Sequence, residues 1–231
     1  MIYRLFTLQI VNGASYLENF RLMIEKERII EGTRGNIYDR NGNILAYNEL
    51  AYSVTIEDVY EGSSKSEELN ATLYKLIHMI EDNGDRIASD FSIILNENND
   101  YEFTVEGTKL LRFKADIYGR LTIDKLYYSE ENASAQEIID YLVNKFKIGS
   151  FPVNESGKKE FVPYEGYTKK EILQIATIRY QINLNSYQKY IPTTIATDVS
   201  KKTVAVIMEN ASELDGVAIE EDMIRKYNYP F

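Results

Sequence analysis

The chain of 231 residues contains no cysteine, no tryptophan and a single histidine, His78. Without cysteine, the protein can form no disulfide, no thiolate metal site and no cysteine nucleophile. A zinc site with one histidine would depend on carboxylates and water, which is not the ligand set that zinc sites use. His78 lies within an apolar helical pattern, so we interpret it as a side chain on the flank of a packed helix. The sequence predicts no metal site and no cofactor.

Basic charge is also scarce. Lysine and arginine number 26 against 36 aspartates and glutamates, which gives a formal net charge of −10. Nucleic-acid binding needs a basic surface for phosphate contacts, so nucleic acid is not an expected partner. The hydrophobic share of 44% and the charged share of 27% are typical of a globular protein with a sizeable core and one or two domains.

No long apolar run is present. Residues 1–11 form the most apolar terminal stretch, but Arg4, Thr7 and Gln9 interrupt it. The stretch is far shorter than the roughly 20 residues that cross a bilayer. It also lacks the basic start and the small-residue cleavage site of a signal peptide.

The most informative stretch is residues 34–42, which read Arg-Gly-Asn-Ile-Tyr-Asp-Arg-Asn-Gly. Asn41 and Gly42 tolerate positive φ, so they predict a hairpin closed by a type I′ turn. Arg34, Asp39 and Arg40 crowd around this loop. The residues alone leave open whether these charges form a solvated rim, the default for such side chains, or a fixed ion-pair network.

Helical and strand patterns are interspersed without regular βα alternation, which predicts an α+β fold. Helix patterns cover 16–27, 108–118 and 200–210, and capping boxes open three further helices. Strand patterns cover 29–56, 190–197 and 217–219, residues 91–105 predict a second hairpin, and 147–166 predict a long surface connection. The three capping boxes are Ser64 with Glu67, Ser134 with Glu137, and Thr168 with Glu171.

Residues 34–42 resemble the first signature of the N-terminal, non-catalytic module of class B penicillin-binding proteins. Further stretches resemble that module in the same order: 5–13, 195–200, 203–210 and 216–220, followed by Arg225, Tyr227 and Pro230. The family usually has Arg-x-Tyr-Pro-x-Gly at this point, whereas Asn228 and Tyr229 separate Tyr227 from Pro230 here. The resemblance covers 1–56 and 165–231 well and is weak between them.

The resemblance implies an extracytoplasmic pedestal at the bacterial cell membrane, with an anchor before residue 1 and a penicillin-sensitive D,D-transpeptidase domain after residue 231. It implies a juxtamembrane segment and helix (1–28), a discontinuous β-rich base (29–56 plus 166–231) and an inserted mixed α/β head lobe (57–165). Its expected partners are its own transpeptidase domain, membrane proteins of cell-wall synthesis and a second copy of the chain. The implied structural signature is Arg34, Gly35, Asp39, Arg40, Asn41, Gly42, Gly216, Arg225 and Pro230.

No catalytic residue is predicted in this chain. Two Ser-x-x-Lys strings begin at Ser156 and Ser186, but no Ser-x-Asn or Lys-[Ser/Thr]-Gly motif accompanies them. The acidic runs 130–131 and 220–222 are interpreted as solvated faces. We expect Asp39 to be partly buried and to pair with an arginine, namely Arg34, Arg40 or Arg225. The alternative to the pedestal is a free-standing extracellular interaction domain without a catalytic partner.

Overall fold

The computed structural model describes residues 34–154, 157–185 and 191–228. These residues divide between two compact units. The first comprises residues 1–48 and 228–231, of which 34–48 and 228 are described; the second comprises residues 49–227. The predicted juxtamembrane segment and its helix (1–28) lie outside the described residues.

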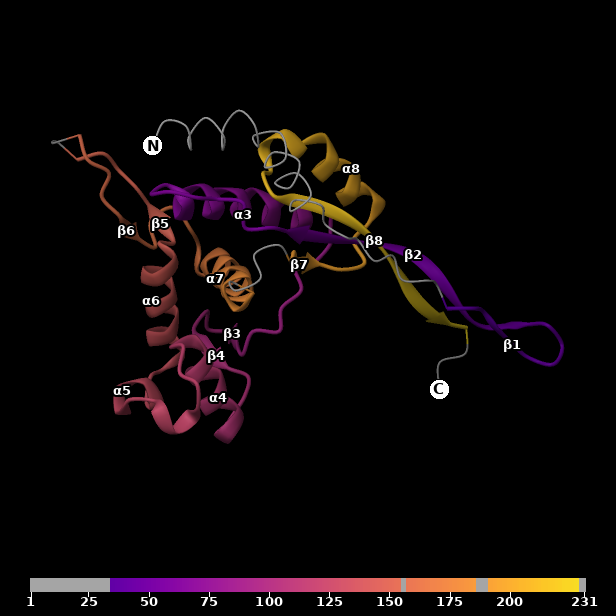
Figure 1. Cartoon of the computed structure of the whole chain (residues 1–231), viewed down its shortest axis with the longest axis horizontal. Helices are drawn as coiled ribbons and strands as arrows, with labels where there is room; N and C mark the ends of the chain where they lie inside the picture. The colour runs from indigo at the N-terminus through magenta and orange to yellow at the C-terminus, as the bar shows by residue number, and fades with distance from the viewer. Residues whose placement is uncertain (1–33, 155–156, 186–190, 229–231) are drawn as a thin grey trace, which may run out of the picture. The chain divides into compact units, whose positions relative to one another are not determined.

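The secondary structure is a mixture of helices and antiparallel strands, which confirms the α+β class (Figure 1). The strands are β1 (Ile37–Tyr38), β2 (Ile44–Ile56), β3 (Ile93–Leu95), β4 (Tyr101–Phe103), β5 (Gly149–Ser150), β6 (Val162–Pro163), β7 (Thr193–Ala196) and β8 (Val217–Tyr227). The helices are α3 (Lys65–Asp82), α4 (Gly107–Ile117), α5 (Tyr128–Glu131), α6 (Ala135–Phe146), α7 (Lys169–Leu184) and α8 (Lys201–Glu209), with 3₁₀ turns at Ile123–Lys125 and Ala211–Glu213.

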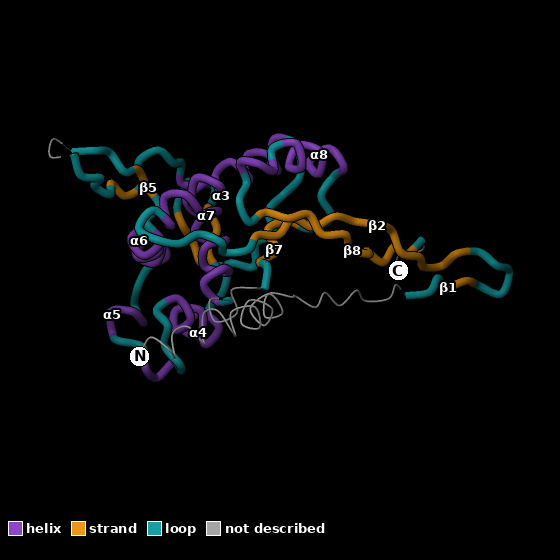
Figure 2. The backbone as a smooth tube through the Cα atoms, turned by 45° about the horizontal axis from the view of Figure 1, so that its top comes forward, coloured by secondary structure: helices purple, strands orange, loops and turns teal. Residues whose placement is uncertain are grey.

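The main sheet is built around β2. This strand pairs with β1 near its start, with β7 at its end and with β8. The β2–β7 pairing is antiparallel and sets Val54 opposite Ala196 and Ile56 opposite Thr193. Both backbone views draw β8 alongside β2 (Figures 1 and 2). The sheet therefore joins strands that lie more than a hundred residues apart in the chain.

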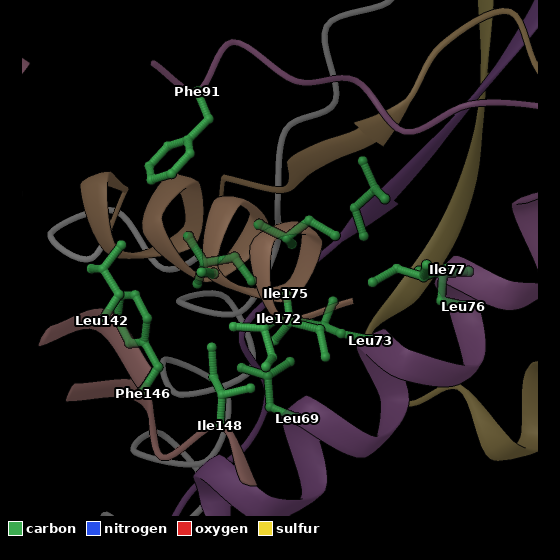
Figure 3. Packing of buried hydrophobic residues seen from close by; sticks show 14 of the residues in the cluster. Leu69, Leu73, Leu76, Ile77, Phe91, Leu142, Phe146, Ile148, Ile172 and Ile175 are labelled. Atoms are coloured by element: carbon green, nitrogen blue, oxygen red, sulfur yellow. The ribbon is translucent and has the colours of Figure 1, made fainter. Parts of the chain in front are cut away.

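The hydrophobic core of the second unit lies where α3, α6 and α7 meet. Leu69, Leu73 and Leu76 recur at helical spacing on α3 and are fully buried. Leu69 and Leu73 lie next to Ile172 and Ile175 of α7, and Leu76 belongs to the same buried cluster (Figure 3). Burying each such side chain stabilises the fold by about 1.5–3 kcal/mol, so this helix junction contributes to the stability of the second unit.

The helix starts only partly follow the capping boxes. Ser134 and Thr168 each accept the backbone N–H three residues later, and the boxes at α6 and α7 are confirmed. The box at Ser64 is wrong, although α3 itself is confirmed: Ser64 has helical dihedrals and makes no side-chain cap. Glu67, its expected partner, instead binds the Lys159 ammonium at 2.5 Å.

Two other stretches differ from expectation. Residues 147–166 contain the short β5–β6 pair, with Gly149 opposite Pro163, rather than a plain surface connection. The strand predicted at 217–219 continues to Tyr227 because it runs along β2. The short hairpin β3–β4 and helix α4 lie where the patterns placed them.

The core crosses the boundary of the predicted base and head. Val54 and Ile195, from the predicted base, belong to the same buried cluster as Leu142, from the predicted head. Because one buried cluster contains residues of both parts, it does not separate the predicted base (29–56 plus 166–231) from the predicted head (57–165). The division stays a prediction.

Candidate functional site

The signature hairpin is closed by a different turn from the predicted type I′. Gly42 has a φ of +84°, but Asn41 is not in the positive-φ region. The Gly42 N–H donates to the Asp39 carbonyl at 3.1 Å, and the Asp39 N–H donates to the Asn43 carbonyl at 2.9 Å. This is the pattern of a type I turn followed by a left-handed glycine, the usual three-residue hairpin loop.

Asp39 explains the choice of turn. Its carboxylate accepts the backbone N–H groups of Asn41 at 2.7 Å and Asn43 at 2.8 Å, and the Asn43 side-chain amide at 2.8 Å. These bonds, that of the Asn43 amide first, lower the pKa of Asp39 below its ordinary value. An aspartate that binds its own backbone two residues on stabilises such a turn locally.

The arginine partner expected for Asp39 stays a prediction. Asp39 lies at the surface, partly covered by its own loop, and neither Arg34 nor Arg40 is among its partners in the described hairpin. Arg225 belongs to β8 of the other unit, and its pairing with Asp39 stays a prediction. Pro230 lies outside the described residues.

Asn228, one of the two residues that depart from the family pattern, is hydrogen-bonded to the start of β2 in this unit. Asn228 donates its backbone N–H to the Leu45 carbonyl at 3.1 Å and its side-chain amide to the Ile44 carbonyl at 2.8 Å. Asn48 donates its side-chain amide to the Arg34 carbonyl. Gly35 is exposed and has open space around its Cα.

Gly216 is a signature residue of the second unit, and only glycine fits at its position. Its φ is +79°, and a Cβ at this position would lie 2.5 Å from the Glu57 carbonyl oxygen and 3.0 Å from a methyl group of Val59. The Glu57 N–H donates to the Gly216 carbonyl at 2.9 Å. Only glycine combines the left-handed backbone with this approach, which fixes the start of β8 against the end of β2.

Two hydrogen-bonded clusters reinforce the same region. Tyr60 is buried; its hydroxyl donates to the Asp215 carbonyl at 2.9 Å and lies 2.7 Å from the Thr72 hydroxyl. Burial raises the pKa of Tyr60. At the start of α8, the Asp85 carboxylate accepts the Ser200 N–H at 2.9 Å and the Thr203 hydroxyl at 2.5 Å. Sequence patterns gave no sign of either cluster because the partners are distant in the chain.

The Asp85 carboxylate is held in its charged form. Burial raises the pKa of Asp85, but the hydrogen bonds from Thr203 and Ser200 outweigh this and lower it below the ordinary value. The carboxylate thus links the loop after α3 to the N-terminus of α8, where negative charge is favourable.

The side chains that the sequence analysis considered and rejected as catalytic groups are His78, Glu130, Ser156 and Ser186. The first two make contacts that fit a structural role. His78 lies on the flank of α3, with Nε2 2.9 Å from Glu171 Oε1 and its ring edge-on to Tyr74. Glu130 accepts two bonds from Arg120, at 3.0 and 2.6 Å, and this pairing lowers the pKa of the Glu130 carboxyl. Ser156 and Ser186 lie outside the described residues.

The described ranges contain neither a metal-binding cluster nor a membrane-spanning helix. Within them, no group of three or more histidine, aspartate or glutamate side chains is arranged to hold a metal ion. In those same ranges, no helix has the length and apolar character that a bilayer crossing requires.

An exposed apolar segment is a surface feature that the sequence patterns did not indicate. It covers residues 121–128, between α4 and the start of α5, and we call it the 121–128 patch. Leu121 is 89% exposed, Tyr128 84%, Tyr127 63% and Ile123 39%. The Arg120 guanidinium lies 4.3 Å from the centre of the Tyr127 ring, and its bonds to Glu130 fix it in place. Four exposed apolar side chains within eight residues make this segment a candidate protein-contact site.

A comparison with protein families shows to which family the chain belongs. Residues 29–230 match the penicillin-binding protein dimerisation domain. The chain belongs to that family. The match includes the stretch between 57 and 164, where the sequence motifs were weak, and it confirms the resemblance drawn from residues 34–42 and 216–220. The dimerisation domain is a non-catalytic module of penicillin-binding proteins.

Two solved structures of penicillin-binding protein 2B are similar to the chain. Penicillin-binding protein 2B of Streptococcus pneumoniae strain 5204 matches with 22% identity and a TM-score of 0.38, over 86% of this chain and 26% of that one. The same protein from strain R6 matches with 22% identity and a TM-score of 0.35, over 85% and 25%. The chain therefore spans about a quarter of the length of these proteins. The comparison with curated proteins finds no similar sequence.

Proposed function

We propose that this dimerisation domain is the extracytoplasmic pedestal of a membrane-anchored peptidoglycan D,D-transpeptidase. In this role it holds a transpeptidase domain that follows it and recruits membrane proteins of cell-wall synthesis. The observation that carries the proposal is the family match across residues 29–230.

The sheet around β2 supports a positioning role. A pedestal must transmit the position of one chain end to the other through rigid contacts. Strand β2 pairs with both β7 and β8, and the Glu57–Gly216 hydrogen bond fastens the start of β8. Strand β8 is the last described element before the position of the proposed transpeptidase domain, so its attachment to β2 would set where that domain begins.

The 121–128 patch supports a recruiting role. Its four apolar side chains are exposed, and aromatic residues of this kind are enriched at the centres of protein interfaces. Tyr127 is held by Arg120, so the patch is partly ordered before any partner binds. Pre-ordering of side chains lowers the entropic cost of binding.

The test is complementation by the full-length parent protein in its own host. The double variant Leu121→Ser with Tyr128→Ser should remain folded and be acylated by penicillin, yet fail to support growth when it is the sole copy. A matched control is Val153→Ser with Met208→Ser, two side chains that are each 64% exposed outside the patch. Growth of the patch variant at the control's rate would contradict the recruiting role.

The second candidate function, a free-standing extracellular interaction domain, is distinguished by the parent gene. The pedestal requires Ser-x-x-Lys, Ser-x-Asn and Lys-[Ser/Thr]-Gly, in that order, after residue 231. A parent that lacks these motifs would favour the free-standing domain.

A further inference from the structure

A cavity of about 320 Å³ lies in the second unit, where α3, α6 and α7 meet the end of β2. Its size is at the lower end of the range for small-molecule sites. Its walls combine charged heads with apolar side chains. They include Asp58, Lys65, Lys145, Phe146, Arg179 and Ile182.

Arg179 is the central group of this cavity. The residue is only 7% exposed, and its guanidinium lies over the Phe146 ring, 5.1 Å from the ring centre. It donates to Asn70 Oδ1 at 3.2 Å and to the Ser66 hydroxyl at 3.4 Å. Both acceptors are neutral. Among the described residues, no carboxylate lies within ion-pair distance of this guanidinium.

The guanidinium is held in a fixed orientation. Asn70 donates its side-chain amide to the carbonyls of Phe146 at 3.1 Å and Lys147 at 2.9 Å, so its oxygen can point only towards Arg179. Burial lowers the pKa of Arg179 to about 10, which still leaves the side chain charged at neutral pH. A guanidinium has five N–H donors, and two of them are used here.

The charges around the cavity do not balance. Asp58 is the carboxylate among the lining residues, and its Oδ2 is bound by Lys65 at 2.6 Å. The other oxygen, Oδ1, is buried and has no hydrogen-bond partner. With Lys65, Lys145 and Arg179 against Asp58, the lining carries a formal charge of +2 in a protein whose net charge is −10. A buried cation without a full counter-charge is costly unless an anion completes it.

We propose that this cavity, which we call the Arg179 pocket, binds a carboxylate that carries a small apolar group. The carboxylate lies against the free donors of Arg179, with Lys145 at the mouth, and the apolar group packs on Phe146 and Ile182. A donor on the same ligand reaches Asp58 Oδ1.

The chemistry of the walls selects the carboxylate over other anions. A guanidinium presents two parallel N–H groups that match the two oxygens of a carboxylate. A phosphate group can use the same fork, but it is more strongly hydrated, and the Arg179 pocket offers it an apolar wall at Phe146 and Ile182. A cation is excluded by the excess of positive charge.

The test is a titration of the 231-residue chain followed by NMR, with benzoate, benzamide and inorganic phosphate as separate probes. Benzoate should bind saturably with a Kd in roughly the millimolar range, as expected for so small a ligand, and shift the Arg179 side-chain and nearby amide signals. Benzamide has the same shape without the charge and should not bind. Arg179→Lys keeps the charge but removes the fork, and should weaken benzoate binding about tenfold or more.

Two further lysine variants test whether the effect on benzoate binding is specific to the Arg179 pocket. Lys145→Gln, at an exposed residue, should preserve the fold and weaken benzoate binding about threefold, since one charge contact is lost. Lys202→Gln makes the same charge change on α8, away from the Arg179 pocket, and should leave the Kd unchanged. Absence of saturable benzoate binding, equal binding of benzamide, or tighter binding of phosphate than of benzoate would each overturn the proposal.

Discussion

Replacing Gly216 by alanine should destabilise the second unit by about 2–5 kcal/mol, the sum of two causes. The first cause is the backbone, because a left-handed residue with a Cβ costs roughly 1–2 kcal/mol relative to glycine. The second is space, since the new Cβ would lie 2.5 Å from the Glu57 carbonyl oxygen. Relieving such overpacking by moving backbone costs typically about 1–3 kcal/mol.

Gly62→Ala separates these two causes. Gly62 has a φ of +83°, close to that of Gly216, but nothing lies within 4 Å of the position its Cβ would take. Its replacement should therefore cost only the backbone part, roughly 1–2 kcal/mol. Urea unfolding of both variants, followed by circular dichroism, measures the difference. Equal losses for the two variants would show that Gly216 does not fasten β8 through close approach.

Three further perturbations have defined outcomes. Ser134→Ala removes the cap of α6 and should cost about 1 kcal/mol in urea unfolding, whereas Ser64→Ala, at a start without a side-chain cap, should stay within about 0.5 kcal/mol. Asp39→Ala should speed amide hydrogen exchange in the 39–43 loop and Arg40→Ala should not; equal effects would favour the ion-pair interpretation. Asp85→Asn should destabilise the protein at pH 7, and the loss should shrink as the solution is acidified. Folding lowers the pKa of this carboxyl below its ordinary value of 3.8, so its contribution is fully present above that value and is lost as the pH falls through the folded-state pKa. A difference that stays constant on acidification would contradict this role.

The sequence predicted those features whose partners are close in the chain. The α6 and α7 capping boxes depend on residues three apart, and the β3–β4 hairpin on a short polar loop. The box at Ser64 is wrong because Ser64 has helical dihedrals, and Glu67 binds Lys159, 92 residues away, instead. The hairpin at Asn41–Gly42 was predicted, but its turn type was not, because the Asp39 side chain selects the turn.

Features that depend on distant segments escaped prediction. Gly149 pairs with Pro163 so closely that a Cβ there would overlap the Val162 carbonyl, yet nothing near Gly149 in the sequence indicates it. One residue of the Arg179 pocket could have been noticed in the sequence. Arg179 follows Ile172 and Ile175 at helical spacing and so falls on the buried face of α7, where a charged residue needs an explanation. That explanation requires Asn70 and Ser66, which only the fold brings near.

The most direct test of the pedestal is covalent labelling with a fluorescent penicillin. The 231-residue chain and the full-length parent should be incubated side by side and separated by denaturing electrophoresis. We expect a labelled parent and an unlabelled chain, because the chain lacks the Ser-x-Asn and Lys-[Ser/Thr]-Gly motifs that support acylation. Covalent label on the 231-residue chain, at Ser156 or Ser186, would contradict it.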